Sequence, residues 1–244
     1  MTTFGLVHGG WHGAWCWELL TPLLEHAGHV VVTMDLPCDD PSADLDAYAD
    51  VVCQTLDGSG DDVILVGHSL GGHTIPLVAA RRPVRHLVYL CSVVPRIGSS
   101  LMDQVADDPD MSNPGFLPAL GVDGHNRQIW TDLGLARKHL FADCDDATAD
   151  AAIERLRPQA LHLMTLMYPL TEFPAVGCTY IVCTDDQMVP AAWSKRVARD
   201  RLGADLIELP GSHSPFLSRP QALADALIGI VDGGARGEAN SAAS

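Results

Sequence analysis

An apolar run that leads directly into a glycine-bounded serine constrains this chain more than any other feature of its sequence. Val63 to Val66 is continuous and apolar, and Gly67-His68-Ser69-Leu70-Gly71-Gly72 follows at once. Such a run is typical of a strand buried on both faces, as in a parallel sheet. A strand-to-helix turn sharp enough to expose Ser69 Oγ brings the backbone too close for side chains at Gly67 and Gly71. The pattern predicts a parallel α/β sheet that displays a serine hydroxyl.

The rest of the chain alternates strand and helix patterns, as such a sheet requires. Strand patterns cover residues 3–7, 30–32, 62–66, 84–90, 179–182 and 206–209. Helical patterns cover about 15–24, 45–56, the stretch from the serine turn to about 82, 191–202 and 220–231. This alternation predicts a doubly wound, mostly parallel sheet of about six strands.

The alternation stops between residues 95 and 174. This stretch begins with clusters of Gly, Pro and Asp, and it then shows helical patterns at 135–141 and 147–156. It contains no convincing strand pattern. We therefore predict a core of residues 1–94 and 175–232, with a helical cap of residues 95–174 inserted before the last two strands. Residues 233–244 are rich in Gly, Ala and Ser and are predicted to form a disordered tail.

Composition and charge exclude several classes of partner. The chain has 244 residues, about the size of one α/β domain, and a formal net charge of −16. Such a surface repels phosphate backbones and anionic lipids, so we expect neither nucleic-acid nor membrane binding. A small-molecule substrate is the expected partner, and the oligomeric state stays open, with a homodimer as one option.

The sequence also lacks the usual signatures of metals, cofactors and secretion. There is no H-E-x-x-H, no paired-cysteine spacing and no phosphate-binding glycine loop, so we expect no metal and no cofactor. The seven cysteines are odd in number, and several lie in apolar runs, which argues against a disulfide framework. The first residues, MTTFGLVHGG, do not resemble a signal peptide. A cytoplasmic location is therefore expected.

A serine hydroxyl is a weak nucleophile unless a base takes its proton. Among 11 histidines, His213 fits this role because it follows the last predicted strand on a glycine turn. A carboxylate should orient its imidazole, and the loop after the penultimate strand offers Asp185 and Asp186. The order serine, aspartate, histidine is that of α/β-hydrolases.

An oxyanion formed at such a serine needs two backbone N–H groups. One would come from Leu70, directly after the serine, and the other from Gly10, in the loop after the first strand. Trp11 next to it would either form a wall of the acyl pocket or pack in the core or under the cap. His68 and His162 are the remaining candidates for contact with substrate. His68 has an alternative role in bracing the serine turn, and His162 lies in the cap, which faces the site.

These residues resemble the α/β-hydrolase superfamily over nearly the whole chain, and within it the plant methylesterase and hydroxynitrile lyase group with its bacterial relatives. The matching segments are Leu6-Val7-His8-Gly9 with His12-Gly13-Ala14-Trp15-Cys16-Trp17, Gly67-His68-Ser69-Leu70-Gly71-Gly72, and Ile181-Val182-Cys183-Thr184-Asp185-Asp186 with Pro190. In this group the catalytic aspartate precedes a proline by four positions, which implies Asp186. The second oxyanion donor lies two residues after the motif histidine, which implies Gly10.

Three departures from the lyase pattern resemble the esterase branch. Ser214 stands where hydroxynitrile lyases carry lysine, Gly10 where they carry threonine, and His68 where they carry glutamate. The leading hypothesis is therefore a serine hydrolase that cleaves a small, fairly apolar carboxylic ester through an acyl-enzyme. Two alternatives remain. One is a lyase, cofactor-free dioxygenase or biosynthetic tailoring enzyme (cyclase or dehydratase) that uses the histidine–aspartate pair as base. The other is a non-catalytic small-molecule receptor.

Overall fold

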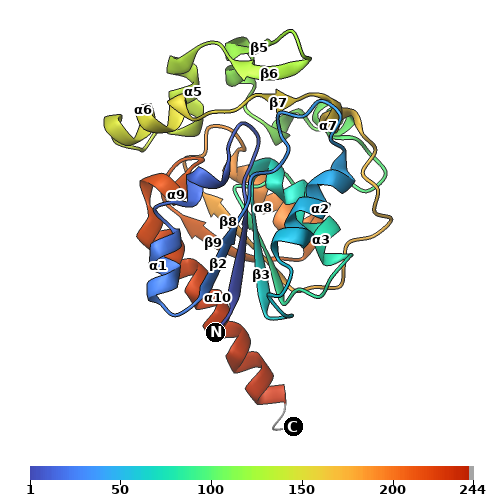
Figure 1. The fold of residues 1–244 in the computed structure, drawn as a ribbon, viewed down its shortest axis with the longest axis vertical. Helices are drawn as coiled ribbons and strands as arrows, with labels where there is room; N and C mark the ends of the chain where they lie inside the picture. The colour runs from blue at the N-terminus through green and yellow to red at the C-terminus, as the bar shows by residue number, and fades with distance from the viewer. Residues whose placement is uncertain (242–244) are drawn as a thin grey trace.

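The centre of the molecule is one parallel sheet of six strands (Figure 1). The computed structural model describes residues 1–241, and it describes side chains for residues 1–233. The strand order is β2-β1-β3-β4-β8-β9, and every neighbouring pair is parallel. The strands are β1 (Thr3–Val7), β2 (Val30–Thr33), β3 (Val63–His68), β4 (His86–Leu90), β8 (Cys178–Cys183) and β9 (Asp205–Leu209). The predicted α/β-hydrolase sheet is confirmed.

Burial along the strands explains their sequence patterns. All residues of β1 and β3 are buried, so these central strands read as continuous apolar runs. The edge strands β2 and β9 are half-exposed, and β9 carries Asp205 and Glu208.

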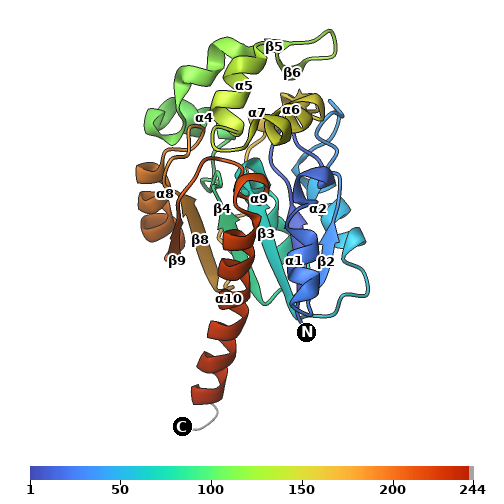
Figure 2. The same ribbon diagram turned by 90° about the vertical axis from the view of Figure 1, so that its left-hand side faces the viewer.

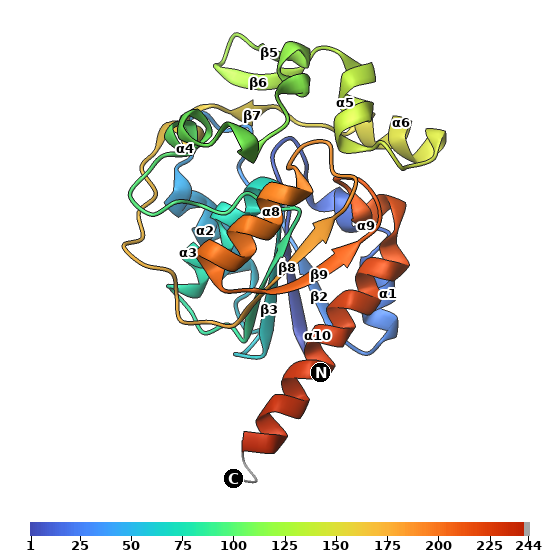
Figure 3. The ribbon, with the colours of Figure 1, turned by 180° about the vertical axis from the view of Figure 1, so that it is seen from behind.

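Helices cover both faces of the sheet. On one face lie α1 (Thr21–His26), α9 (Pro215–Ser218) and α10 (Pro220–Ser241), which stand in front of the sheet in Figure 2. On the other lie α2 (Leu45–Thr55), α3 (Ile75–Ala79) and α8 (Ala191–Val197), which Figure 3 shows to the left of the strands, opposite α1 and α10. The 3₁₀ helix η1 (Ala14–Trp17) follows β1, and the π-helical turn η5 (Ala198–Leu202) extends α8. Among the residues that the structure describes, no helix is long and apolar enough to span a membrane.

The segment between β4 and β8 forms a cap over the carboxyl ends of the strands (Figures 1 and 2). Its helical parts are α4 (Leu101–Asp107), η3 (Pro109–Met111), η4 (Pro114–Ala119), α5 (Leu133–Leu140), α6 (Asp146–Glu154) and α7 (His162–Thr165). It also contains an antiparallel sheet of β5 (Leu120–Val122), β6 (Arg127–Trp130) and β7 (Gln159–Ala160). The prediction of a purely helical cap is therefore wrong. Strands of two to four residues are too short to show the alternation that reveals a strand.

The C-terminal prediction also needs correction. Helix α10 was expected to end near Val231 and a disordered tail to follow, but the helix continues to Ser241. Once a helix has formed, each further residue adds one hydrogen bond, so the helix can extend through glycine-containing sequence. Residues 242–244 of the predicted tail lie outside the described residues.

Candidate active site

Ser69 stands on a tight turn that requires glycine two positions before and two positions after it. It follows β3 directly with φ 50°, in the left-handed region that non-glycine residues rarely adopt. A Cβ at Gly67 would lie 2.9 Å from the Gly71 carbonyl oxygen, and one at Gly71 would lie 2.7 Å from the Val7 carbonyl oxygen. The predicted need for glycine at both positions is confirmed, and the turn projects Ser69 from the carboxyl edge of the sheet.

Two hydrogen bonds hold the backbone of this turn. The Ser69 carbonyl accepts from the Val93 N–H at 3.0 Å and from Ser92 Oγ at 2.9 Å. Both donors lie in the loop after β4, the neighbouring strand. The strained residue is thus fixed by its surroundings, which is the condition under which such strain persists.

The structure joins His213 to Asp186. Nδ1 of His213 lies 2.8 Å from Asp186 Oδ2, and the two side chains are only 1% and 2% exposed. The other carboxylate oxygen, Oδ1, accepts from the N–H groups of Met188 at 2.7 Å and Val189 at 3.0 Å. The carboxylate is therefore fixed on both sides, and an Nδ1–H donor leaves Nε2 of His213 free to accept a proton.

Asp185 has a different task. Its Oδ2 accepts from the Gly211 N–H at 3.1 Å and from Thr184 Oγ1 at 3.1 Å, so it shapes the loops that follow β8 and β9. Of the two candidate aspartates, only Asp186 contacts His213. Within the described residues no hydrogen bond joins Ser69 Oγ to His213. Such bonds are often loose before a substrate binds.

The loop after β1 packs directly against the serine. A Cβ at Gly9 would lie 2.7 Å from Ser69 Cβ, so this loop can approach so closely only with glycine there. Gly10 and Leu70 line the same cavity as Ser69, as expected of the two residues chosen as oxyanion donors. Trp11 follows with φ 61°, and its carbonyl accepts from the Arg157 N–H of the cap at 2.7 Å.

The cavity above Ser69 has a volume of about 190 Å³ and is almost wholly apolar. None of its lining side chains is ionisable, and four of the chain's seven methionines contribute to it. The lining residues are Gly10, Trp11, Ser69, Leu70, Val93, Leu101, Met102, Val105, Met111, Ser112, Phe116, Leu117, Gln128, Met164, Met188 and Val189. An uncharged, apolar small molecule fits such a lining.

Comparison with known proteins agrees with this geometry. The sequence profile described as the alpha/beta hydrolase family matches residues 6–226. The chain belongs to the alpha/beta hydrolase family.

Its relatives include named esterases. Methylesterase 9 of Arabidopsis thaliana is 28% identical, over 95% of this chain and 99% of that one. The pyrethroid hydrolase of Sphingobium wenxiniae is 27% identical, over 95% of this chain and 88% of that one. A crystal structure of a pyrethroid hydrolase from Sphingobium faniae superimposes with a TM-score of 0.82 at 25% identity, covering 96% of this chain and 99% of that one. The resemblance stated from the sequence motifs is confirmed.

One predicted substrate contact of this alpha/beta hydrolase, Trp11, lies in the cavity. Its ring also packs edge-on against Trp130 of β6, with centroids 5.4 Å apart. Trp11 thus combines the two alternatives drawn from the sequence, a wall of the cavity and a packing partner of the cap.

The prediction that His68 contacts substrate is wrong. Its side chain is wholly buried behind the serine turn and does not line the cavity. Its ring centroid lies 4.7 Å from that of His213, and Nε2 is 3.0 Å from the His213 carbonyl oxygen. Burial lowers the pKa of His68 well below its usual value, so the ring stays neutral. The alternative role, bracing the turn, fits this position.

His162 does not contact the cavity either. It is exposed at the start of α7, whereas Met164 of the same helix lines the cavity. Residues two apart on a helix point to nearly opposite sides, so a cap helix that contributes Met164 turns His162 away. The sequence showed that a cap exists but not which side of each helix faces the site.

Most cavity residues were missed because they belong to the cap. Met102, Val105, Phe116, Leu117 and Gln128 lie in α4, η4 and β6. The one available signal was methionine, which occurs at 102, 111, 164 and 167 in the cap and is over-used at adaptable binding surfaces. Within the described residues, no three His, Cys, Asp or Glu side chains are grouped to hold a metal ion.

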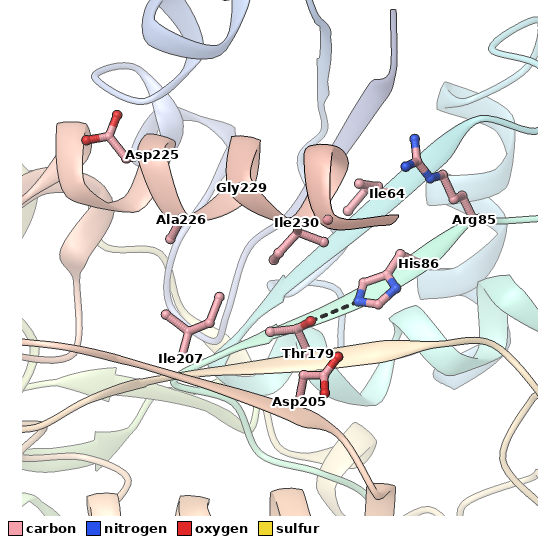
Figure 4. Close-up of a pocket in the computed structure, with 11 residues that line it drawn as sticks. Ile64, Arg85, His86, Thr179, Asp205, Ile207, Asp225, Ala226, Gly229 and Ile230 are labelled. Carbon is pink, nitrogen blue, oxygen red and sulfur yellow. Dashed lines mark hydrogen bonds between the residues drawn. The ribbon is translucent and has the colours of Figure 1, made fainter. Parts of the chain in front are cut away.

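A larger cavity of about 560 Å³ lies on the opposite side of the molecule, between α10 and the sheet (Figure 4). Its lining includes His86, Thr179 and Asp205, near the amino ends of β4, β8 and β9. His86 Nε2 lies 2.9 Å from Thr179 Oγ1. Ser69 stands at the carboxyl edge, so this cavity is separate from the candidate active site.

Proposed function

We propose that this protein is a carboxylic ester hydrolase in which Ser69 attacks the ester carbonyl. The observation that carries the proposal is the buried His213–Asp186 pair at 2.8 Å, at the same sheet edge as a serine held at φ 50°. This arrangement, with the order serine, aspartate, histidine, is the one that activates serine in alpha/beta hydrolases.

In the proposed reaction, Nε2 of His213 takes the proton of Ser69 Oγ as the oxygen bonds to the carbonyl carbon. The N–H groups of Gly10 and Leu70 donate to the oxyanion that forms. The intermediate collapses when the C–O bond to the alcohol breaks, and His213 returns the proton to that alcohol. Water then loses a proton to His213 and attacks the acyl-serine. His213 returns that proton to Ser69 Oγ as the bond between the acyl carbon and Oγ breaks, which releases the acid and restores the enzyme.

The substrate is proposed to be a small, uncharged, apolar ester. A cavity of about 190 Å³ without ionisable side chains disfavours charged groups, because their desolvation would not be compensated. The net charge of −16 adds repulsion against anions. Methylesterase 9 and the pyrethroid hydrolase among the relatives support ester cleavage.

A second candidate function is a lyase-type or tailoring reaction in which the His213–Asp186 pair acts as base and Ser69 only binds. One relative supports this candidate. Norfluorocurarine synthase 2 of a Strychnos species, which is named as a synthase and not as an esterase, is 28% identical over 94% of this chain and 95% of that one. A receptor is the third option, because a tobacco protein named salicylic acid-binding protein 2 is 29% identical over 93% of this chain and 96% of that one.

Kinetics of two single variants separate these functions. Ser69→Ala and His213→Ala should both abolish turnover across a panel of p-nitrophenyl esters that differ in acyl length. Turnover lost only in His213→Ala would favour the base-only reaction. A wild-type protein that binds esters or their acids tightly without turning over any of them would favour the receptor. Retained hydrolysis in Ser69→Ala would overturn the proposal.

A further inference from the structure

His8 lies where β1 ends and the loop that carries Gly10 begins. Its side chain is only 1% exposed. Nδ1 lies 2.8 Å from the Gly9 carbonyl oxygen, and Nε2 accepts a hydrogen bond from the Leu36 N–H at 2.9 Å. Nε2 can accept only when it carries no proton, so the proton of the neutral ring is on Nδ1. Nδ1–H therefore donates to the Gly9 carbonyl.

This carbonyl belongs to the peptide unit that provides the proposed oxyanion donor. The Gly9 C=O and the Gly10 N–H lie in one rigid plane, so a group that fixes the oxygen also fixes the direction of the N–H. Donation to the oxygen also polarises the unit and strengthens the N–H as a donor. The only other donor to this oxygen within the described residues is the His12 N–H, at a longer 3.4 Å.

We propose that His8 is a positioning residue that aims and strengthens the Gly10 N–H toward the oxyanion. The inference rests on the proposed function, because it assigns a task only if an oxyanion forms at Ser69. His8 does not line the cavity above Ser69 and acts on substrate through the Gly9–Gly10 peptide.

Burial keeps His8 in the state that this task needs. The apolar surroundings lower its pKa to about 4, while the bond to Gly9, Arg157 and Asp35 make smaller contributions. The ring thus stays neutral at neutral pH. The Leu36 N–H then holds the tautomer with the proton on Nδ1.

His12 provides a matched control four residues away. It is equally buried at 1% exposure, and its Nδ1 lies 2.8 Å from the Gly10 carbonyl oxygen. That oxygen belongs to the Gly10–Trp11 peptide, whose N–H is not a proposed oxyanion donor. The two histidines thus make the same bond to successive peptides, and only the bond from His8 should affect catalysis.

Two variants divide the functions of the His8 ring. Asparagine places its amide near the position of Nδ1, so His8→Asn keeps the bond to Gly9 and loses the bond to Leu36. Glutamine reaches one bond further, so His8→Gln keeps a partner for Leu36 and loses the bond to Gly9. His12→Gln is the control. For each protein, kcat and KM on a p-nitrophenyl ester and the Ki of an alkyl boronic acid, which forms a tetrahedral adduct on serine, are measured.

The expected result is a loss of transition-state binding in one variant only. In His8→Gln, kcat should fall about 10- to 100-fold, less than the 10²–10³-fold typical of deleting a donor outright, while KM changes little. The Ki of the boronic acid should rise in parallel. His8→Asn should retain most of kcat, and His12→Gln should stay near wild type. Equal losses in His8→Gln and His12→Gln, or no loss in His8→Gln, would overturn the inference.

A measurement on the wild-type protein covers the case in which His8→Gln does not fold. ¹⁵N spectra of histidine-labelled protein should show His8 protonated on Nδ1, and that proton should shift when the boronic acid binds while the His12 proton does not. A proton on Nε2, or equal shifts at both rings, would contradict the positioning role. Failure of the proposed function would look different, because the wild-type protein would then neither hydrolyse the ester nor bind the boronic acid through Ser69.

Discussion

The carboxyl edge of the sheet and the cap above it are built on opposite principles. At the sheet edge, Ser69 is held by two bonds to its carbonyl, and Asp186 is held by two backbone N–H groups. In the cap, several of the side chains that line the cavity are open to solvent. Met102 and Leu117 are each 55% exposed.

This difference between the two regions suggests different tasks: the sheet edge carries out the reaction, and the cap selects the substrate. Groups that transfer protons or stabilise charge must stay in place, and a rigid strand edge holds them there. A methionine-rich lining adapts its shape to different apolar ligands. The two regions meet where the Arg157 N–H donates to the Trp11 carbonyl at 2.7 Å and the Ala160 N–H to the Cys38 carbonyl at 2.6 Å. Changes at the edge should therefore alter turnover, and changes in the cap should alter substrate preference.

The largest expected effect is a loss of kcat on substitution of Asp186, with the neighbouring Asp185 as its control. Asp186→Asn should lower kcat about 10⁴-fold, because an amide favours the wrong tautomer of His213. Asp185→Asn is the matched control, since an amide oxygen can still accept from the Gly211 N–H. Steady-state kinetics on one ester would measure both. Similar losses in the two variants would break the assignment of Asp186.

The second effect is a loss of folding stability in Gly71→Ala, which tests how closely the backbone packs at the sheet edge. Gly71→Ala places a Cβ 2.7 Å from the Val7 carbonyl oxygen and 2.8 Å from that of His8, and backbone atoms cannot move aside. We expect a loss of about 1–3 kcal/mol in the free energy of unfolding, measured by urea denaturation. Gly124→Ala in the cap is the control, because nothing lies within 4 Å of its Cβ position. Equal stability of the two variants would contradict the close approach at the turn.

A smaller effect should appear in the cap. Leu117→Ala removes part of the cavity wall, and since the side chain is half-exposed the loss should be about 1 kcal/mol of binding. That corresponds to a rise of about fivefold in KM for a bulky apolar ester, with kcat for a short ester unchanged. Val122→Ala, an exposed cap residue outside the cavity, should change neither constant. A fall in kcat for both esters in Leu117→Ala would contradict the division of tasks.

The last effect concerns acid stability, and its measure is a change of slope with pH. Burial lowers the pKa of His8 and His73 to about 4 and that of His12 to about 3. Between those values and about 6.5 the unfolded chain binds protons that the folded chain does not, so stability rises with pH. Each ring contributes up to about 1.4 kcal/mol per pH unit in its window. Urea midpoints should therefore fall steadily from pH 7 to pH 4 and less steeply in His73→Asn. A flat profile would contradict the burial of neutral rings.

The sequence predicted the sheet edge far better than the cap. Glycine spacing and continuous apolar runs reflect strict local requirements, so β3, the Ser69 turn and the loop with His213 followed from the chain alone. The resemblance was needed to choose Asp186 over Asp185. The strands β5 to β7 are too short to show a period, and the position of His162 depends on how α7 is rotated. Tertiary packing decides such features, and no local pattern encodes them.

The most direct test of the central claim is to find the residue that a serine-directed fluorophosphonate labels. The wild-type protein should gain the mass of one phosphonyl group, located on the peptide that contains Ser69. Prior incubation with an ester substrate should slow the labelling, and Ser69→Ala should not be labelled. A protein that hydrolyses esters but carries the adduct on another residue, or is labelled equally in Ser69→Ala, would contradict the assignment of Ser69 as nucleophile.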